Sequence, residues 1–334
     1  MADALISPAV GGVMWAASAG ALAWSTAKIK NELGEKKLPV MAVAGAFVFA
    51  AQMINFTIPA TGSSGHIGGG ILLAGFLGPA PALLTIAAVL LVQALFFADG
   101  GLLAFGCNVF NMGVIPCLLA YPFIFKPLAK NFKPGRIALA ASAAVIAGLP
   151  LGAFFVVLET LISGITALPF GTFVLLMLPI HIAIAVGEAA ATSAVLIFVH
   201  RMRPEILESS ASGALVSQGV PVKRVVVALG AAALITGALL SLFASAYPDG
   251  LEWSIEKVTG STELEAEGAV YAGAGALQET TSFMPDYNFK GAGEDAPPVG
   301  ASVAGIVGAL ITCVLAGGIG FVISAAKRKK AQAA

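Results

Sequence analysis

Long stretches without a single charged residue constrain the fold of this chain more than any other feature. No Asp, Glu, Lys or Arg lies between Lys37 and Asp99, or between Ile137 and Leu158. Only 11% of the 334 residues are charged, whereas a soluble domain carries about 25%. A helix needs about 20 apolar residues to cross a bilayer. The sequence therefore predicts an all-α, polytopic membrane protein.

Nine apolar segments can be delimited. They span residues 9–26, 38–58, 67–78, 80–97, 104–125, 136–158, 171–199, 223–246 and 300–325. The third segment is too short to cross a bilayer unless it is tilted or broken, and the Gly78-Pro79 pair at its end is a turn signal. We therefore expect region 59–78 to be partly re-entrant and to be buried in protein or to line a cavity.

The basic residues predict the orientation. Sixteen of the 18 fall on one side of a nine-span arrangement, after segments one, five and seven, before segment eight, and at the C-terminus. The positive-inside rule makes that side cytoplasmic. We expect an extracytoplasmic N-terminus, a cytoplasmic C-terminus and a multi-pass protein of the prokaryotic cell (inner) membrane.

Two polar regions divide the chain. Residues 1–205 form one membrane domain, the Ser- and Gly-rich residues 206–222 form a cytoplasmic linker, and residues 223–334 form a second module with two segments. The second module has an outer loop, residues 247–298, with ten acidic and two basic residues. Its length and composition predict weak order.

Polar residues at the outer ends of the apolar segments are candidates for one cavity that opens outward, because burying them in a bilayer costs free energy. They are Asn55, His66, Asp99, Asn108 and Asn111. Each also has an ordinary structural interpretation as a helix cap or turn residue.

Two further polar residues, His181 and Glu188, lie inside segment seven. They are two helical turns apart, about 10 Å along the axis, and so share one face of the helix. Hydrogen bonding between helices and a part in transport are both open to them, with the first slightly favoured.

The sequence around His66 leaves three possibilities, which are a core histidine, a metal ligand and part of a catalytic device. The neighbouring Gly62-Ser63-Ser64-Gly65 resembles a serine-hydrolase motif, so an intramembrane protease with Ser64 as nucleophile and His181 as base is one alternative. The predicted topology separates these two residues, which weakens that alternative. The three glycines after Ile67 instead allow another part of the backbone to approach closely.

Several blocks of the sequence closely resemble the CbiM/NikM family, the substrate-binding membrane components of energy-coupling factor (ECF) ABC transporters for cobalt and nickel. The blocks are NFTIPATGSSGHIGGGILLAGFLGP, VQALFFADGGLLAFGCNVFNMGVIP, HIAIAVGEAAAT and the N-terminal DALISPAVGGVMW. The resemblance covers roughly residues 1–205. The later PDGLEW, residues 248–253, resembles the PDGLE domain of NikN/CbiN-type partners.

The resemblance implies a transporter subunit, not an enzyme, that captures Co²⁺ or Ni²⁺ as its substrate, without an organic cofactor, to supply cobalamin biosynthesis or nickel enzymes. The implied partners are a transmembrane coupling protein (CbiQ/NikQ-like) and two cytoplasmic ATPases (CbiO/NikO-like), since this chain has no GxxxxGK[ST] phosphate loop. Membrane lipid surrounds it, and no nucleic acid is expected. A vitamin-specific ECF component is a further alternative, but the outer polar residues have few aromatic neighbours.

The resemblance also implies a ligand set. It assigns the metal to His66 and to nitrogens at the N-terminus, including the amine of Met1, with Asn55, Ser64, Asp99, Asn108 and Asn111 in supporting positions. Square-planar nitrogen ligands suit Ni²⁺, and related sites hold Co²⁺.

The start of the sequence departs from the family. Members begin Met-His and use that histidine as a ligand, whereas this chain begins Met-Ala-Asp. We expect the natural chain to begin two residues upstream, with Met-His before the present Met1. The chain as numbered is then expected to bind metal poorly.

Overall fold

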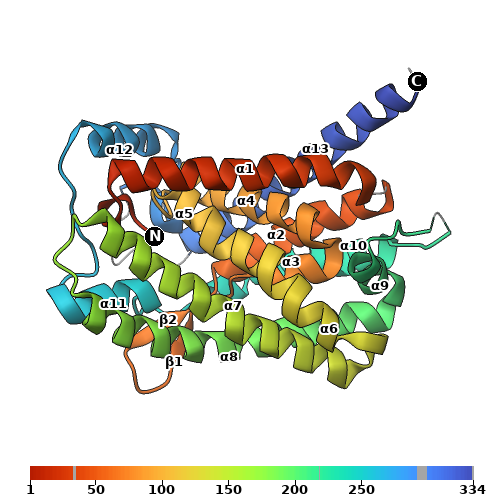
Figure 1. The fold of residues 1–334 in the computed structure, drawn as a ribbon, viewed down its shortest axis with the longest axis horizontal. Helices are drawn as coiled ribbons and strands as arrows, with labels where there is room; N and C mark the ends of the chain where they lie inside the picture. The colour runs from red at the N-terminus through yellow and green to blue at the C-terminus, as the bar shows by residue number, and fades with distance from the viewer. Residues whose placement is uncertain (33–34, 218, 292–298, 333–334) are drawn as a thin grey trace.

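The computed structural model describes residues 1–32, 35–217, 219–291 and 299–332 as an elongated bundle of helices that run along its long axis (Figure 1). The N-terminus, a small hairpin and helices α11 and α12 lie at one end, on the left of Figure 1. The short helices α6 and α9 and the C-terminus lie at the opposite end. The two ends of the chain are therefore far apart along the bundle.

The helices follow the apolar segments of the sequence. They are α1 (Pro8–Glu32), α2 (Leu38–Gln52), α3 (Gly70–Leu77), α4 (Pro79–Phe96), α5 (Phe105–Val109), α6 (Lys126–Leu128), α7 (Pro134–Ser163), α8 (Phe170–Met202), α9 (Pro204–Ser212), α10 (Lys223–Ala238), α11 (Gly250–Thr259), α12 (Ala269–Thr281) and α13 (Val299–Gln332). Short 3₁₀ turns are η1 (Asp3–Leu5), η2 (Glu35–Lys37), η4 (Lys130–Phe132), η5 (Leu240–Phe243) and η6 (Pro285–Tyr287).

A wide π-helix, η3 (Phe110–Phe125), continues α5 and leads into α6. Pro116 and Pro122 lie inside it. Proline lacks the N–H that an α-helix needs at each interior position. The two prolines are therefore consistent with the departure of this span from α-helical geometry.

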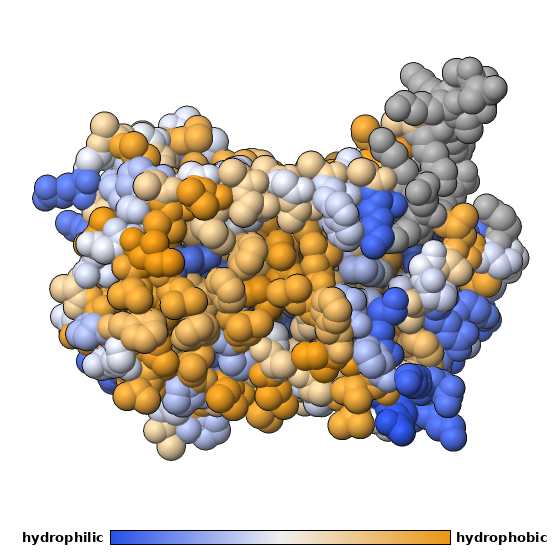
Figure 2. All heavy atoms as spheres, viewed as in Figure 1, coloured by the Kyte–Doolittle hydropathy of each residue, from blue (hydrophilic) through white to orange (hydrophobic). Residues whose placement is uncertain are grey.

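Five helices in the described part of the chain are long and apolar enough to cross a membrane. They are Pro79–Phe96, Phe105–Leu128, Pro134–Ser163, Phe170–Met202 and Val299–Ala326, and the shorter Leu38–Gln52 is also apolar. Large apolar side chains face outward from them, among them Phe123 and Leu175, each 74% exposed. Apolar residues dominate the middle of the bundle surface in Figure 2, as contact with lipid tails requires.

The count of nine predicted segments is not reproduced as nine long apolar helices. The predicted third segment is the eight-residue α3, and every one of its residues is buried. The predicted second segment ends early, because α2 stops at Gln52 and the chain then forms the hairpin of β1 (Phe56–Ile58) and β2 (Ser63–Gly65). Among the described residues, the regular structure is thus helical apart from one two-stranded antiparallel sheet.

Helices lie in the predicted linker and in the outer loop for which composition predicts weak order. The linker region 206–222 begins within α9, which packs against α3. The acidic outer loop contains α11 and α12, and residues 292–298 of it lie outside the described part. Asp249 caps α11 by accepting hydrogen bonds from Leu251 N and Glu252 N, at 2.8 Å each, while the Glu252 side chain bonds back to the Asp249 N–H. This capping box explains how a helix begins in so polar a segment.

Candidate functional site

His66 follows the β1–β2 hairpin directly, in the non-helical link to α3. The hairpin has the register Phe56↔Gly65 and Ile58↔Ser63. It packs tightly on α8, because a Cβ added at Gly65 would lie 2.4 Å from a side-chain carbon of Ile184. A larger residue at position 65 would push the hairpin away from α8. The packing of the hairpin on α8 therefore fixes the position of the His66 backbone, which follows the hairpin directly.

The backbone after His66 is fixed by one buried carboxyl group. Gly68 N and Gly69 N donate hydrogen bonds to the two oxygens of Glu188, at 2.9 Å each. Glu188 lies on α8 and is 3% exposed. Gly69 has a φ of 77°, and a Cβ there would lie 2.5 Å from Val48, so only glycine fits. The carboxyl group thus holds the chain between His66 and α3 in an irregular conformation inside the bundle.

The N-terminal residue lies inside the fold. Its carbonyl oxygen accepts hydrogen bonds from Gly101 N, at 3.0 Å, and from Asn108 Nδ2, at 3.3 Å. Two residues later, Asp3 accepts a hydrogen bond from Ala104 N at 2.8 Å. The start of the chain is therefore held against the segment that connects α4 to α5.

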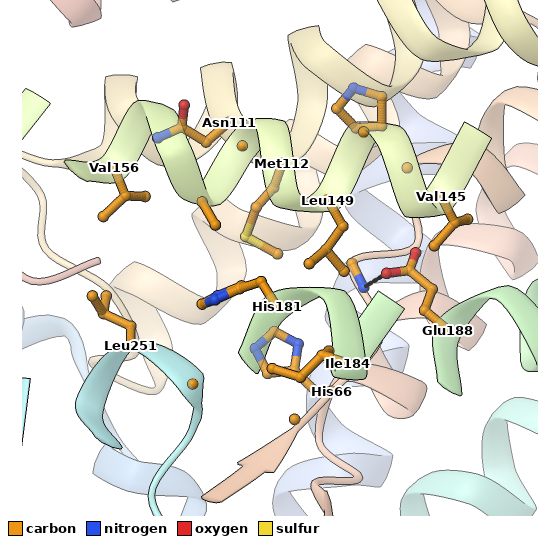
Figure 3. Close-up of a pocket in the computed structure, with 18 of the residues that line it drawn as sticks. His66, Asn111, Met112, Val145, Leu149, Val156, His181, Ile184, Glu188 and Leu251 are labelled. Atoms are coloured by element: carbon orange, nitrogen blue, oxygen red, sulfur yellow. Dashed lines mark hydrogen bonds between the residues drawn. The ribbon is translucent and has the colours of Figure 1, made fainter. Parts of the chain in front are cut away.

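These elements enclose one cavity of about 160 Å³. Met1, His66, Asn108, Asn111, His181 and Glu188 line it, together with apolar residues of η3, α7 and α8. Figure 3 shows the His66 and His181 rings on one side of the cavity and Asn111 on the other, with Glu188 bonded at its end. The cavity has room for several water-sized ligands, since one needs about 10–15 Å³.

The two imidazole rings make the same kind of contact with the backbone. His66 Nδ1 lies 3.1 Å from the Ile67 carbonyl oxygen, and His181 Nδ1 lies 2.7 Å from that of Met177. A carbonyl oxygen only accepts, so in the neutral form of each ring Nδ1 carries the proton and Nε2 has the free lone pair. An Nε2 lone pair is the ordinary imidazole ligand for a metal ion.

Side chains alone do not complete a conventional metal site. Nowhere in the described ranges do three His, Cys, Asp or Glu residues come together in a way that could hold an ion. A cation bound here would need backbone or N-terminal donors in addition to imidazole. The Met1 residue on the cavity wall brings such donors close.

Three of the residues predicted to surround the cavity lie outside it and contact the second module. Ser64 donates from Oγ to the Tyr247 carbonyl oxygen, at 2.7 Å, and from N to that of Pro248, at 2.8 Å. The Asn55 carbonyl oxygen accepts a hydrogen bond from Ser245 N at 2.7 Å.

Asp99, the third of these residues, accepts a hydrogen bond from the Tyr287 hydroxyl. Burial, reinforced by the Asp99 carboxylate, raises the pKa of the Tyr287 hydroxyl. The tyrosine therefore stays protonated and can donate over the whole physiological pH range. Asn108 and Asn111, in contrast, line the cavity.

The second module also supplies part of the cavity wall. Asp249, Gly250 and Leu251, at the start of α11, line it. A Cβ at Gly250 would lie 3.1 Å from His181 Cε1, so the close approach requires glycine or a shift of the ring. Trp253 Nε1 donates to the Thr61 carbonyl oxygen at 3.0 Å and fastens α11 to the hairpin.

One buried carboxyl group escaped the sequence analysis. Glu159 is 4% exposed and accepts a hydrogen bond from Asn111 Nδ2 at 2.9 Å. The predicted segment 136–158 stops one residue short of Glu159. In the structure α7 continues to Ser163, which brings Glu159 inside the bundle.

Comparison with known proteins identifies the fold. The family described as the cobalt uptake substrate-specific transmembrane region, CbiM, matches residues 1–206, which is more than half of the chain. The chain belongs to the CbiM family. The PDGLE domain matches residues 223–325, so this CbiM protein is fused to a second module.

Related proteins share both parts. The fused nickel transport protein NikMN of Rhodobacter capsulatus is 30% identical over 285 residues, which cover 81% of this chain and 79% of that protein. A relative from Archaeoglobus fulgidus, whose assignment as a fused nickel transport protein NikMN is itself inferred, is 29% identical and covers 94% of this chain and 95% of its own length. A crystal structure described as a transition metal transporter is 28% identical, covers 64% of this chain and 97% of its own, and has a TM-score of 0.54.

Membership in the CbiM family decides between the functional classes. The family and its relatives are nickel and cobalt transport proteins, not enzymes. The protease alternative therefore falls, and Ser64 has a structural explanation in its bonds to the second module. The chain is a multi-pass membrane protein of metal transport.

We predict that Glu188→Gln destabilises the region around His66. The glutamine NH₂ group would face a backbone N–H of Gly68 or Gly69, so one hydrogen bond is lost and two donors oppose each other, at a cost of about 1–3 kcal/mol. Thermal unfolding in detergent should occur several degrees lower than in the wild type. Glu267→Gln, at an exposed position, is the matched control and should leave the transition unchanged. Equal stability of the two variants would show that the bonds to Glu188 do not hold this segment.

Proposed function

We propose that the chain is the substrate-capture subunit of an ECF-type ABC transporter that imports Co²⁺ or Ni²⁺. It takes the ion from the outer side, while a separate coupling protein and two cytoplasmic ATPases supply the energy. The observation that carries this proposal is the placement of the N-terminal residue and His66 on the wall of one cavity. Fused nickel transport relatives with the same two modules support nickel or cobalt as the substrate.

The proposed ligands are nitrogens. His66 supplies Nε2 and Met1 supplies its amine, with Asn108 holding the N-terminus in place through the Met1 carbonyl oxygen. Ni²⁺ and Co²⁺ prefer nitrogen donors to the hard oxygens that suit Mg²⁺ or Ca²⁺. The apolar residues that η3, α7 and α8 place on the cavity wall lower the local dielectric constant and thereby strengthen the binding of a cation to these donors.

His181 and Glu188 have supporting parts in this proposal. Glu188 fixes the backbone that carries His66. His181 offers a second imidazole on the same wall. The proposed domains are a metal-binding domain at 1–205, a linker at 206–222 and an accessory module at 223–334. The first residues of α11, in the accessory module, line the cavity.

The proposed topology has nine membrane passages or partial passages, with the N-terminus outside and the C-terminus in the cytoplasm. In its support, the N-terminus, the hairpin, α11 and α12 share one end of the bundle (Figure 1). The hydrophilic residues at the other end, seen on the right of Figure 2, include the basic residues around α6 and α9. The positive-inside rule assigns that end to the cytoplasm.

His66→Ala is expected to abolish high-affinity binding of Co²⁺ and Ni²⁺ while leaving membrane insertion intact, because it removes one ligand from a preformed cavity. Isothermal titration of the purified protein, with metal analysis of cells expressing the partner subunits, measures both binding and uptake. His200→Ala is the control, since His200 stacks on Phe132 at the end of α8, away from the cavity. Wild-type uptake by His66→Ala would refute the assignment.

Adding Met-His ahead of Met1 is expected to tighten metal binding. The added residues bring an imidazole and a further backbone amide next to the cavity, and chelation by adjacent nitrogens suits a square-planar ion. Titration of the two forms under the same conditions compares their dissociation constants. Equal affinities would exclude an N-terminal chelate and leave His66 with other donors, of which His181 is the first to examine.

The orientation can be tested with single cysteines in a variant that lacks Cys107, Cys117 and Cys313. A cysteine at Ser261, exposed after α11, should react with a membrane-impermeant thiol reagent in intact cells. A cysteine at Gly135, where an added Cβ meets no atom within 4 Å, should react only after the cells are opened. The reverse pattern would turn the protein around and place His66 on the cytoplasmic side.

A further inference from the structure

Helix α3 is a separate rigid piece inside the bundle. All eight of its residues are buried, and a glycine in the left-handed region stands at each end, Gly69 with φ of 77° and Gly78 with φ of 88°. Its flanks are tight as well. A Cβ at Gly70 would lie 2.5 Å from Pro116, and one at Gly75 would lie 2.6 Å from Leu196. The helix is therefore confined sideways and connected to its neighbours in sequence through two glycine joints.

The two ends of α3 are held by different parts of the protein. At the start, Glu188 accepts hydrogen bonds from Gly68 N and Gly69 N. At the other end, Ser210 Oγ donates to the Phe76 carbonyl oxygen at 2.6 Å, and Lys37 Nζ donates to that of Leu77 at 3.5 Å.

The polar groups at the two ends suit the helix. Carboxyl oxygens that accept hydrogen bonds at the N-terminus and an ammonium group at the C-terminus both complement the helix dipole. Lys37 is 2% exposed, and its Nζ also lies 3.2 Å from Ser210 Oγ. Lysine and serine thus form one buried polar contact on the last turn of α3, at the opposite end from the cavity.

The position of α3 connects two distant places. Its first residue follows His66 by only four positions, whereas its last turn touches α9, the helix that precedes the second module. Eight residues extend about 12 Å. A displacement of α9 would therefore be passed along a confined helix to the backbone that carries His66.

We propose that Ser210 and Lys37 are positioning residues of the metal site, which hold His66 in its binding position through α3. This inference rests on the proposed function, because it takes His66 as a metal ligand. It makes the affinity for the cation depend on where α9 lies. The cytoplasmic end of the protein is then able to loosen a cation bound at the outer end.

The test compares two neighbouring serines of α9 in the full-length protein. Ser210→Ala removes the hydroxyl that bonds to α3, whereas Ser209→Ala removes a hydroxyl that bonds only to Ile206 within α9. Both serines are buried, so the two variants remove similar atoms from similar surroundings. Isothermal titration with Ni²⁺ and with Co²⁺ gives the dissociation constant and the number of sites for each variant.

The expected result is a dissociation constant roughly 3- to 10-fold higher for Ser210→Ala with an unchanged number of sites, and wild-type binding for Ser209→Ala. Ser210→Thr, which keeps the hydroxyl, should restore the affinity. Lys37→Met should weaken binding in the same way. If one variant fails to fold, the other still decides the question.

An unchanged dissociation constant in both Ser210→Ala and Lys37→Met would overturn the proposal. A loss of sites without a change in affinity would overturn it too, since that result is typical of damage to folding alone. Equal weakening by Ser209→Ala would overturn it as well, because the Ser209 hydroxyl bonds to Ile206 and not to α3. His66→Ala in the same series tests the proposed function separately from the role of Ser210 and Lys37. Wild-type binding by His66→Ala would overturn the proposed function itself.

Discussion

The hydrogen bonds from Gly68 and Gly69 to Glu188 are the interaction on which the rest of the site depends. Backbone that is neither helix nor sheet is tolerated inside a membrane protein only when its polar groups find partners. Here the carboxyl group of α8 is that partner on one side, and Gln52 Nε2, which donates to the Gly68 carbonyl oxygen at 2.9 Å, serves on the other. Because these hydrogen bonds satisfy the backbone, His66 can lie in a buried segment that is neither helix nor strand.

Hydrogen bonds to backbone groups and side chains also join the two modules. The Asn55 carbonyl oxygen accepts a hydrogen bond from Ser245 N, Ser64 donates to the Tyr247 and Pro248 carbonyl oxygens, and Asp99 accepts a hydrogen bond from Tyr287. These contacts surround the cavity without entering it. Residues of both the CbiM part and the PDGLE part line the cavity. The cavity therefore has its full wall only when the two parts are docked.

Hydropathy was sufficient to predict α4, α7, α8 and α13, because long apolar runs have few alternatives in a membrane. It could not predict the hairpin or the helices of the outer loop, which depend on local turns and on the capping box of Asp249. Of the polar residues grouped by depth along the membrane, Asn108 and Asn111 line the cavity, whereas Asn55 and Asp99 contact the second module. The depth of a residue in the membrane does not say which neighbour its side chain faces, and Asn55 and Asp99 were grouped with the cavity residues for this reason. Glu159 was not considered, because the predicted segment ended at residue 158.

The attachment of Met1 has a consequence for the order in which the protein is made. Its carbonyl oxygen bonds to Gly101 and Asn108, about a hundred residues later in the chain, and the cavity beside it is closed by Asp249. The hydrogen bonds of the Met1 carbonyl oxygen therefore cannot form until α5 has been synthesised, and the cavity wall beside Met1 lacks the residues of α11 until that helix has followed. During synthesis the segment around Met1 reaches its final contacts only after most of the chain exists.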